Sequence, residues 1–431
     1  MKKENSSKGN NKILKNTLSV VIAVVIIAIS FAGGYFTNYL FRGKNVGVVT
    51  DIVSLMDRVG YIYDPVTGEE REITEEEIGD AIVNAFLDDY SAYYTKEEYE
   101  SKVSQGEGNY WGIGVQFYYS DTQVDVVVGN SPADHAGLIA GDILVSGKSA
   151  GQEEKTFFST ATDVVTFFVS CPIGMDIEID YLRDGKDCVA TVKTRPYVAS
   201  YVNYYDSEVR YSFFADEIKK PVGRETENNV LKIDSDDVAY IRLDAFEGDA
   251  SAQIKEALSF MKERGRSKLI LDLRNNGGGF MDTATEIASY FINNGGKRKS
   301  VVAYAVGKTG TETFFTPKNN YFSHIEKTVV LANQHTASAS ECLIGALAHY
   351  KDSLKDMADI ILEENSEGVA KTYGKGIMQT TYRLMSGGAL KLTTAKIYWP
   401  DNSTSIHGVG VTNGTPAKSS DVLSVALSKL R

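Results

Sequence analysis

The chain has 431 residues, of which 43% are hydrophobic, and its formal net charge at pH 7 is −12. A chain of this length is too long for one small hydrophobic core, and we expect roughly two to four domains. The acidic balance disfavours nucleic acid and anionic membrane surfaces as partners, because binding either through a general basic field needs clustered lysine and arginine.

Cysteine and histidine are too scattered to form a disulfide framework or a metal centre. The three cysteines, at positions 171, 188 and 342, form no CxxC pair, and we interpret them as buried or inert thiols. The five histidines show no HExxH or similar spacing. We therefore expect no bound metal and no cofactor.

A lysine-rich start precedes one long uncharged segment. Lysines at positions 2, 3, 8, 12 and 15 lie ahead of residues 17–40, which carry no charge and are long enough to span a bilayer. Because lysines on the N-terminal side favour a cytoplasmic start, we expect a cytoplasmic tail at 1–16, a single-pass anchor at 17–40 in the cell membrane, and the remaining chain outside the cytoplasm. A cleaved signal peptide has the same charge order and is the alternative, although no clear small-x-small site follows the apolar core.

Residues 45–105 have the spacing of short amphipathic helices. Apolar side chains recur at three- and four-residue intervals over 52–59 and again over 78–86. Residues 73–77, Ile-Thr-Glu-Glu-Glu, offer a capping start for the second helix.

Residues 106–197 alternate between apolar and polar side chains and contain frequent turn residues, which predicts a small β-barrel capped by two helices. The expected strands are 113–119, 124–128, 143–146, 176–182 and 189–195, and the expected helices are 132–136 and 161–169.

From residue 198 onward, larger strand and helix patterns alternate, which predicts an α/β core with parallel strand pairing. The expected strands are 238–243, 268–273 and 327–332, and the expected helices are 250–264, 281–292, 340–348 and a C-terminal one at 421–430.

The first of three turns that could carry chemistry follows the strand at 268–273. It ends in Gly277, Gly278 and Gly279 ahead of a helix, and such a turn exposes backbone N–H groups that can receive an anion or an oxyanion. It is no phosphate loop, because no Gly-Lys-Ser/Thr follows. A glycine turn without a role is an equal alternative for this motif alone.

The second turn places Ser338 at the mouth of the helix predicted at 340–348. An oxyanion formed on a substrate of this serine would meet the favourable end of the helix dipole. Taken alone, Ser338 is more simply interpreted as a helix cap.

The third turn holds Lys375 between Gly374 and Gly376, with Gln379 close by. A lysine with its ordinary pKa of about 10.4 is almost entirely charged at pH 7, so a base role needs a large downward shift, which burial can supply. The Gln379 amide could hold the amine on a nucleophile without adding charge. An exposed turn lysine is the simpler interpretation of this motif alone.

Together the three turns supply a nucleophile, a base and a backbone oxyanion hole, the parts that acyl transfer needs. A Ser-His-Asp arrangement with His335 or His349 as the base is the alternative. Neither histidine is well placed, because His335 lies three residues before Ser338 on the turn and His349 lies at least two turns down the helix.

These segments resemble the C-terminal processing proteases, the tail-specific serine peptidases that carry a PDZ domain, and the resemblance covers nearly the whole chain after the anchor. They are similar to the family's stretch ahead of the PDZ domain, its ligand-loop strand, its SPAxxAGLxxGDxI run, and its DLRxNxGG, SASE and GKGxxQ segments. The matching segments are LDDYSAYY at 87–94, GIGV at 112–115, SPADHAGLIAGDIL at 131–144, DLRNNGGG at 272–279, TASASE at 336–341, and GKG at 374–376 with Gln379.

Together with the predicted transmembrane helix, the resemblance implies a multidomain α+β fold: a small helical region at 45–105, a PDZ β-barrel at 106–197, and an α/β protease core with a C-terminal helix at 198–431. With that anchor, it implies a membrane-anchored serine endopeptidase outside the cytoplasm. Its substrates would be proteins or peptides with apolar, unstructured C-terminal tails. Assembly of the chain into a homo-oligomer is left as an open alternative.

The same resemblance assigns roles to individual residues. Ser338 would be the nucleophile, Lys375 its base and Gln379 the residue that orients the lysine, whereas Ser340 is the family's second serine. The remaining expected site residues are Gly278, Gly279 and Ala339 in the oxyanion hole, Glu341 and Thr372 as supports, and Gly112, Ile113, Gly114 and Val115 as the strand and backbone nest that receive a tail carboxylate.

Two other functions compete with this hypothesis. One is a catalytically inactive PDZ scaffold or regulator of the same architecture, and the other is an esterase or a Ser-His hydrolase. The sequence departs from the family at 408–416, where Asn413-Gly414 replaces Pro-Asp. The interval from Ser338 to Lys375 is also longer by about a dozen residues, including the acidic 352–367, and a surface loop or an extra helical turn is expected to absorb them.

Overall fold

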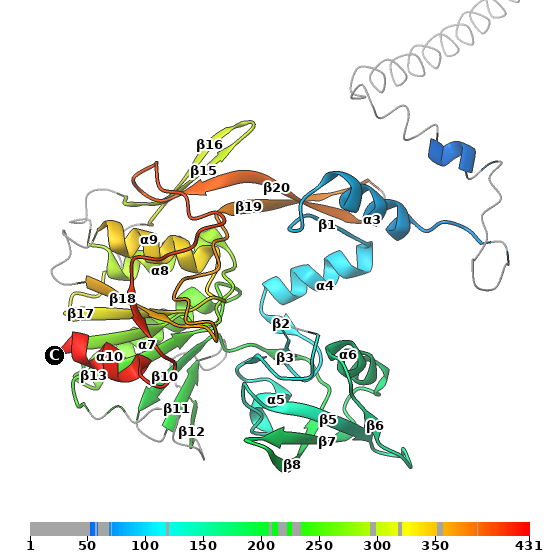
Figure 1. Ribbon diagram of the computed structural model, residues 1–431, viewed down its shortest axis with the longest axis horizontal. Coiled ribbons are helices and arrows are strands. Elements are labelled where there is room, and N and C mark those ends of the chain that lie inside the picture. Colours follow the sequence, from blue (N-terminus) through cyan, green and yellow to red (C-terminus); the bar gives the residue numbers. More distant parts are fainter. Residues whose placement is uncertain are drawn as a thin grey trace, which may run out of the picture. The chain divides into compact units, whose positions relative to one another are not determined.

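The computed structural model describes residues 52–56, 58, 69, 71–117, 120–206, 209–213, 222–225, 233, 235–293, 299–317, 321–350, 357–385 and 387–431. The chain forms two compact units, Met1–Ala81 and Ile82–Arg431, and their elements are numbered as in Figure 1. The predicted tail at 1–16 and the predicted anchor at 17–40 lie outside the described residues. Among the residues that are described, no helix has both the length and the apolar content to cross a membrane.

The described part of the first unit contains the start of helix α3 (Glu75–Phe86). The Glu77 N–H donates to Thr74 Oγ1 at 3.1 Å, and the Thr74 N–H donates to Glu77 Oε2 at 2.9 Å. This reciprocal pair satisfies two amide groups that the first helical turn leaves without acceptors. The predicted capping start at 73–77 is confirmed.

The second unit contains a strand, after the end of α3, where the sequence predicts only helix. Strand β1 (Ala92–Tyr94) precedes helix α4 (Lys96–Gly106), whose capping box joins Thr95 and Glu98. β1 pairs antiparallel with β20 (Ala389–Tyr398), close to the other end of the chain. A strand of three residues with so distant a partner has no local periodicity that could have predicted it.

Residues 109–198 form the expected mixture of short strands and two helices. The four-stranded antiparallel sheet has the order β6-β5-β7-β8, and β3 pairs with β4. Buried residues such as Leu144, Ile177, Ile179 and Phe167 form a separate core. The elements are β2 (Asn109–Tyr110), β3 (Val115–Gln116), β4 (Val126–Val127), α5 (Pro132–His135), β5 (Ile143–Ser149), β6 (Thr156–Phe157), α6 (Ala161–Ser170), β7 (Asp176–Arg183), β8 (Lys186–Lys193) and β9 (Tyr197–Val198).

An eight-stranded sheet forms the centre of the remaining chain, in the order β12-β11-β10-β13-β14-β17-β18-β21. The strands from β13 to β21 pair in parallel, and β10 to β12 form an antiparallel edge. The strands are β10 (Val202–Asp206), β11 (Val209–Phe213), β12 (Val222–Glu225), β13 (Val238–Leu243), β14 (Lys268–Asp272), β17 (Lys327–Ala332), β18 (Met357–Glu363) and β21 (Thr415–Ala417).

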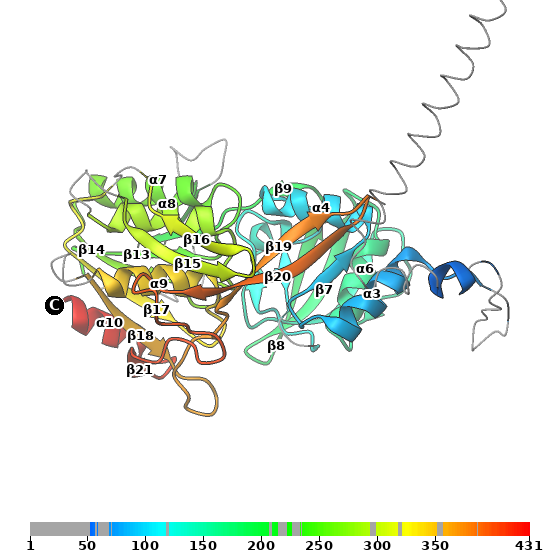
Figure 2. The ribbon, with the colours of Figure 1, turned by 90° about the horizontal axis from the view of Figure 1, so that it is seen from above.

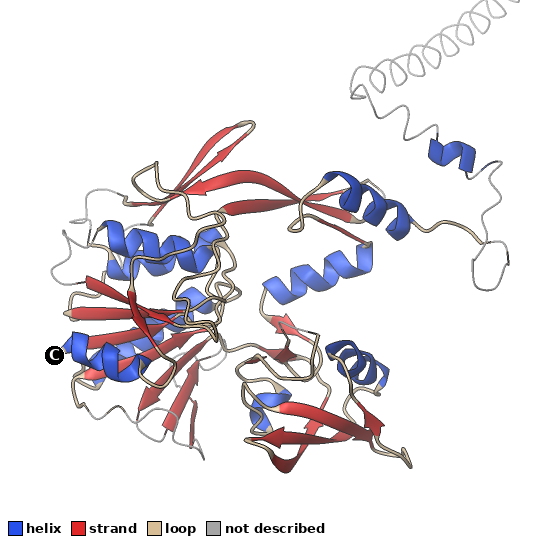
Figure 3. Cartoon of the chain, viewed as in Figure 1, coloured by secondary structure: helices blue, strands red, loops and turns tan. Residues whose placement is uncertain are grey.

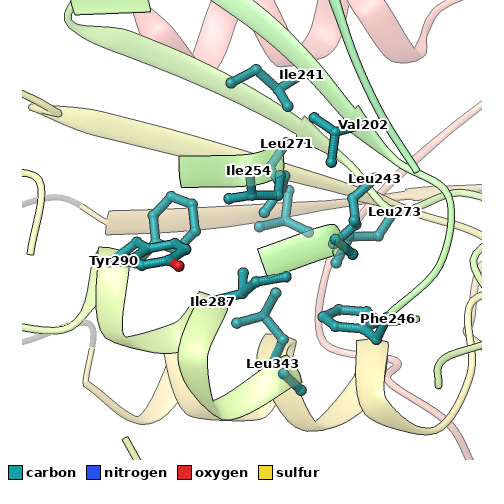
Figure 4. Packing of buried hydrophobic residues seen from close by; sticks show 14 of the residues in the cluster. Val202, Ile241, Leu243, Phe246, Ile254, Leu271, Leu273, Ile287, Tyr290 and Leu343 are labelled. Atoms are coloured by element: carbon teal, nitrogen blue, oxygen red, sulfur yellow. The ribbon is translucent and has the colours of Figure 1, made fainter. Parts of the chain in front are cut away.

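Helices cover both faces of this sheet (Figures 1 and 2). Alternate residues of β13 point to opposite layers, as the two-residue period of a strand requires. Ile241 and Leu243 pack with helices α7 (Ala250–Glu263), α8 (Met281–Phe291) and α9 (Ala339–His349), whereas Val238 and Tyr240 pack with α10 (Val422–Leu430). Figure 4 shows Ile287, Tyr290 and Leu343 of the helical layer against the strand residues. Burial on both faces explains the continuous apolar runs of the central strands.

The predicted α/β core is confirmed in its main elements, and the chain has a mixed α+β fold. Strands 238–243 and 327–332 have the predicted bounds, and the helices of this region begin and end within about one residue of those expected.

The sequence does not predict a second, antiparallel sheet, in which β20 pairs with β1, β15 and β19, and β15 with β16. Its strands include β15 (Val301–Gly307), β16 (Gly310–Phe315) and β19 (Ile377–Arg383), and it extends as a long ribbon in Figure 3. β19 begins two residues after Lys375, so this sheet carries the candidate base into the site.

The expectation for the extra residues before Lys375 is wrong over 357–363. Those residues form β18 of the large sheet, where Ile361 and Leu362 are fully buried, and not a surface loop or a helical turn. The strand's apolar side chains gain more by completing the sheet between β17 and β21 than they would on the surface.

Candidate active site

Ser338 stands at a strained turn between β17 and α9. It is the N-cap of α9 with φ 58° and ψ −115°, a conformation that costs a non-glycine residue roughly 1–3 kcal/mol and needs support from its surroundings. Ala337, Ala339 and Ser340 around it are buried, whereas Ser338 itself is half-buried. The turn therefore presents this serine and hides its neighbours.

The glycine turn lies against Ser338. A Cβ added to Gly278 would come 2.8 Å from both the Ala337 carbonyl oxygen and Ser338 Cβ, and 3.0 Å from the Ala339 nitrogen. Gly278 has φ 104°, which also favours glycine. The tertiary structure thus brings together the first two of the three turns, which are some 60 residues apart in sequence.

Buried Asn276 holds the two turns in register. Its backbone carbonyl accepts hydrogen bonds from the Ala337 N–H and from Ser340 Oγ, both at 3.0 Å. Its side-chain Nδ2 donates to the Leu243 carbonyl at 2.8 Å, and its Oδ1 accepts from the Gly278 N–H at 2.9 Å. The Ser340 hydroxyl therefore makes a structural hydrogen bond.

The three expected oxyanion donors differ in availability. The Ala339 N–H is the first amide of α9, where a helix provides no internal acceptor, and it lies at the positive end of the helix dipole. The Gly278 N–H donates to Asn276 and would have to exchange that partner for an oxyanion. Gly279, at φ 140°, forms an isolated parallel β-bridge with Phe246.

Glu341 joins the nucleophile turn to the lysine turn. Its carboxylate is fully buried, and four groups donate to it. Oε2 accepts from the Ser338 N–H at 2.8 Å and from the Lys375 N–H at 2.9 Å, while Oε1 accepts from the Gly374 N–H at 2.8 Å and from Thr372 Oγ1. One carboxylate oxygen therefore fixes the backbones of Ser338 and Lys375 relative to each other.

The charge state of Glu341 reflects two opposing effects. Burial raises the pKa of the Glu341 carboxyl above its ordinary value, and the hydrogen bonds from Thr372 and from three backbone amides oppose that rise. Thr372 is fully buried and accepts from the Val411 N–H at 2.7 Å. The segment at 408–416, where the sequence departs from the family pattern, thus reaches this support.

The Lys375 amine lies over the ring of Tyr90, with Nζ 5.1 Å from the ring centroid. Among the residues that the structure describes, the Lys375 side chain makes no hydrogen bond with the side chain of Ser338 or of Gln379. The Gln379 Nε2 donates instead to Thr393 Oγ1 at 3.0 Å. The backbone N–H groups of Ser338 and Lys375 therefore share one acceptor on Glu341, whereas the Lys375 amine lies over an aromatic ring.

The electrostatic surroundings shift Lys375 toward its neutral form. Burial first, and then the charge of Lys391, hold the pKa of Lys375 below its ordinary value, and the carboxylates of Asp88 and Glu341 oppose that shift. Burial disfavours the ammonium form because the low-dielectric interior solvates it poorly. A lowered pKa is what a general base acting near neutral pH requires.

The Cys342 thiol and the two alternative histidine bases have other surroundings. Burial raises the pKa of the Cys342 thiol, one helical turn after Ser338, to about 12, so this thiol is neutral near pH 7. His349 is the last residue of α9, at the end opposite to Ser338, and its ring packs on Tyr350. His335 Nε2 lies 3.1 Å from Gln334 Nε2.

The expected tail-binding residues line a groove in the 109–198 segment. Its cavity of about 450 Å³ lies between residues 110–117 and α6, and includes Gly112, Ile113, Gly114 and Val115. Gly112 and Gly114 have φ 110° and 82°, and a Cβ on Gly114 would come 2.2 Å from Ser131 Cβ. No charged side chain is among the residues that line this cavity.

In the part of the chain that the structure describes, no group of three or more His, Cys, Asp or Glu side chains is arranged to hold a metal ion. The groups around Ser338 can support acyl transfer: the serine hydroxyl, the backbone N–H groups at the start of α9, and a lysine whose pKa is lowered.

Comparison with known proteins relates the core of the chain to a family of peptidases. Residues 237–415, which include both Ser338 and Lys375, match the family model described as Peptidase family S41. The core of the chain is thus similar to Peptidase family S41, and the chain is a serine-type peptidase of the C-terminal processing kind.

Its relatives extend this likeness beyond the core. The chain is 28% identical over 421 residues to a probable CtpA-like serine protease of Staphylococcus aureus (strain N315), covering 94% of this chain and 73% of that one. It is 25% identical over 438 residues to the namesake of Staphylococcus haemolyticus, covering 98% and 77%. The solved photosystem II D1 C-terminal processing protease aligns with a TM-score of 0.49 and 20% identity, over 88% and 94% of the two chains.

Sequence reasoning missed two residues of this candidate site, Asn276 and Tyr90. The available signal for Asn276 was its place inside the glycine motif, whereas its burial is known only from the structure. Tyr90 belongs to a segment that the family resemblance covers, but nothing in its local sequence indicates that it contacts Lys375.

Proposed function

We propose that this serine peptidase is an endopeptidase with a Ser-Lys dyad, in which Ser338 attacks the scissile carbonyl and Lys375 is the general base. The observation that carries the proposal is the Glu341 carboxylate oxygen that accepts from the N–H groups of both residues. A catalytic pair needs a fixed separation, and one buried oxygen that accepts from both backbones sets the separation of those backbones.

The chemistry follows from the groups around Ser338. Neutral Lys375 accepts the Ser338 hydroxyl proton as Oγ attacks the carbonyl, and the oxyanion forms at the Ala339 N–H with help from the α9 dipole. The lysine then gives the proton to the leaving amine, and water releases the acyl group by the same steps. Before attack the amine swings from Tyr90 to Ser338, and the Gln379 amide orients it there.

We propose that residues 106–197 are a PDZ domain that receives the apolar C-terminal tail of a protein substrate. The uncharged groove supports an apolar tail, and the positive φ of Gly112 and Gly114 supports a backbone nest for the terminal carboxylate. A membrane anchor at 17–40 would keep this peptidase at the cell surface, outside the cytoplasm.

The test uses the full chain in detergent micelles and an unfolded protein that ends in apolar residues. Ser338→Ala and Lys375→Ala should each lower cleavage by at least about 1,000-fold, since triad-type residues act as a unit. Lys371→Ala, an exposed lysine four residues before Lys375, is the matched control and should cut normally. Near-normal cleavage by Lys375→Ala would place the base elsewhere.

The alternative is an inactive scaffold of the same architecture, favoured by the resting position of Lys375 over Tyr90. It predicts that the unmodified chain binds tailed substrates and cuts none of them between pH 6 and 10. Binding and cutting are separated by fluorescence anisotropy of a labelled tail peptide beside gel analysis of the protein that carries it. Topology is checked by attaching a cysteine-reactive, membrane-impermeant reagent to whole cells.

A further inference from the structure

Tyr90 is the aromatic partner of the candidate base, and it stands outside the match to the S41 core. An ammonium group above an aromatic face is attracted by the negative face of the ring, whereas a neutral amine gains little from it. The contact therefore distinguishes between the two protonation states of Lys375.

The position of the Tyr90 ring is set by its backbone and by its hydroxyl. The carboxylate of Asp88 accepts from the N–H groups of Tyr90 and Ser91 at 3.2 and 3.0 Å and from Ser91 Oγ at 2.8 Å, which closes a tight turn. β1 begins immediately afterwards, with Ala92 opposite Lys391 of β20. The Tyr90 hydroxyl lies 3.3 Å from the hydroxyl of Tyr373.

The phenol of Tyr90 is neutral under ordinary conditions. The hydrogen bond with Tyr373, then burial, raise the pKa of Tyr90 to about 12. The ring therefore meets Lys375 as a neutral aromatic face and not as a phenolate, and the attraction between them is of the cation–π kind.

Charged groups from several elements also face the lysine. Lys391 of β20 disfavours the ammonium form, and Asp88 of the turn and Glu341 of α9 favour it. Lys102 of α4 acts on Lys391, whose own pKa is lowered by burial and by that neighbour. These groups act whether or not the ring is present, so an effect of removing the ring can be isolated.

We propose that Tyr90 is the resting seat of the Lys375 ammonium: its ring holds the charged amine away from Ser338 and releases the amine when the proton leaves. Tyr90 is a positioning residue, since it acts through Lys375 and not on the substrate. The proposal rests on the proposed function to the extent that Lys375 is the base. It makes deprotonation and movement onto Ser338 one coupled event.

Replacing Tyr90 with leucine keeps an apolar side chain and removes the aromatic face. The ammonium then loses its partner, so the acid limb of kcat/KM against pH should move to lower pH by about half a unit to one unit. On the rising limb this is an increase in rate of about three- to tenfold. Tyr90→Phe keeps the face and loses the bond to Tyr373, so its acid limb should stay within about 0.2 units of the parent's.

The matched control is Tyr99→Leu. The Tyr99 ring carries a similar contact with Arg383, at 5.4 Å, on a different element, and its removal should leave the acid limb unmoved. The melting temperature of each variant shows whether it is folded. An acid limb that stays in place in folded Tyr90→Leu, or that moves equally in Tyr90→Phe, overturns the proposal.

A second measurement reads the lysine without activity. In a Ser338→Ala background, trace labelling with acetic anhydride gives the fraction of neutral Lys375 amine at each pH, by mass spectrometry of its peptide. The midpoint should fall by the same half to one unit when Tyr90 becomes leucine. If the midpoint falls but Lys375→Ala remains active, Tyr90 holds the Lys375 ammonium but Lys375 is not the base. An unchanged midpoint refutes the role of Tyr90 itself.

Discussion

Replacing Glu341 with glutamine should uncouple Ser338 from Lys375 with almost no change in side-chain volume. The carboxylate accepts from three backbone N–H groups and from Thr372 Oγ1, but an amide offers one oxygen and adds two donors. If the amide nitrogen takes the Oε2 position, the N–H groups of Ser338 and Lys375 lose their acceptor. If it takes the Oε1 position, the Gly374 N–H faces another donor.

Either arrangement leaves one or two buried amides without an acceptor. Each such group costs about 1–3 kcal/mol, so the free energy of unfolding should fall by about 2–4 kcal/mol. At about 2–4 °C per kcal/mol, the melting temperature should fall by roughly 4–16 °C. Because a displacement of about 1 Å in a catalytic group can cost about 100-fold, kcat/KM should fall by about that factor at temperatures where the variant is folded.

The assay compares kcat/KM on a tailed substrate with thermal unfolding followed by circular dichroism. Glu286→Gln is the matched control. Glu286 is a half-buried glutamate on α8 that accepts from Ser251 Oγ and from the Tyr290 hydroxyl, and its variant should keep kcat/KM within about twofold. A folded Glu341→Gln enzyme with kcat/KM near that of the parent would refute the idea that Glu341 fixes Ser338 relative to Lys375.

Two further predictions concern the glycine turn and the pH profile. Gly278→Ala should lose at least about 100-fold in kcat/KM, because the added Cβ meets the nucleophile turn at 2.8 Å and φ is 104°; Gly277→Ala, whose Cβ meets nothing within 4 Å, should keep the parent melting temperature and cut at least about ten times faster than Gly278→Ala. Lys391 lowers the pKa of Lys375, so Lys391→Gln should raise that pKa and move the acid limb of kcat/KM to higher pH. Exposed Lys396→Gln on the same strand is the control, and a limb that moves equally in both variants, or to lower pH, contradicts the assigned effect.

The central sheet was predictable because its local patterns agree with its final environment. Strands 238–243 and 327–332 are continuous apolar runs, as strands buried on both faces require, and they have the predicted bounds. The antiparallel sheet was missed because its strands show little apolar alternation: most residues of β16 and β19 are exposed or half-buried. The sequence predicts a surface position for strand β18, because acidic residues flank its apolar centre.

The candidate site shows the same division. Glycines, a serine at a helix mouth and a lysine between glycines are local features, and together with the family resemblance they indicated acyl transfer before any geometry was available. The contacts of Glu341, Asn276 and Tyr90 are not local, since each joins segments that are far apart in the chain.

By itself, the sequence determined the main elements of the core, the three turns and the reaction class, because strand and helix periods, helix caps and glycine turns are written in neighbouring residues. Only the tertiary structure decided how Ser338 and Lys375 are held together and where the lysine amine rests. Both depend on one buried carboxylate and one aromatic ring that packing brings from distant segments, and no short-range pattern specifies which distant partner a side chain will meet.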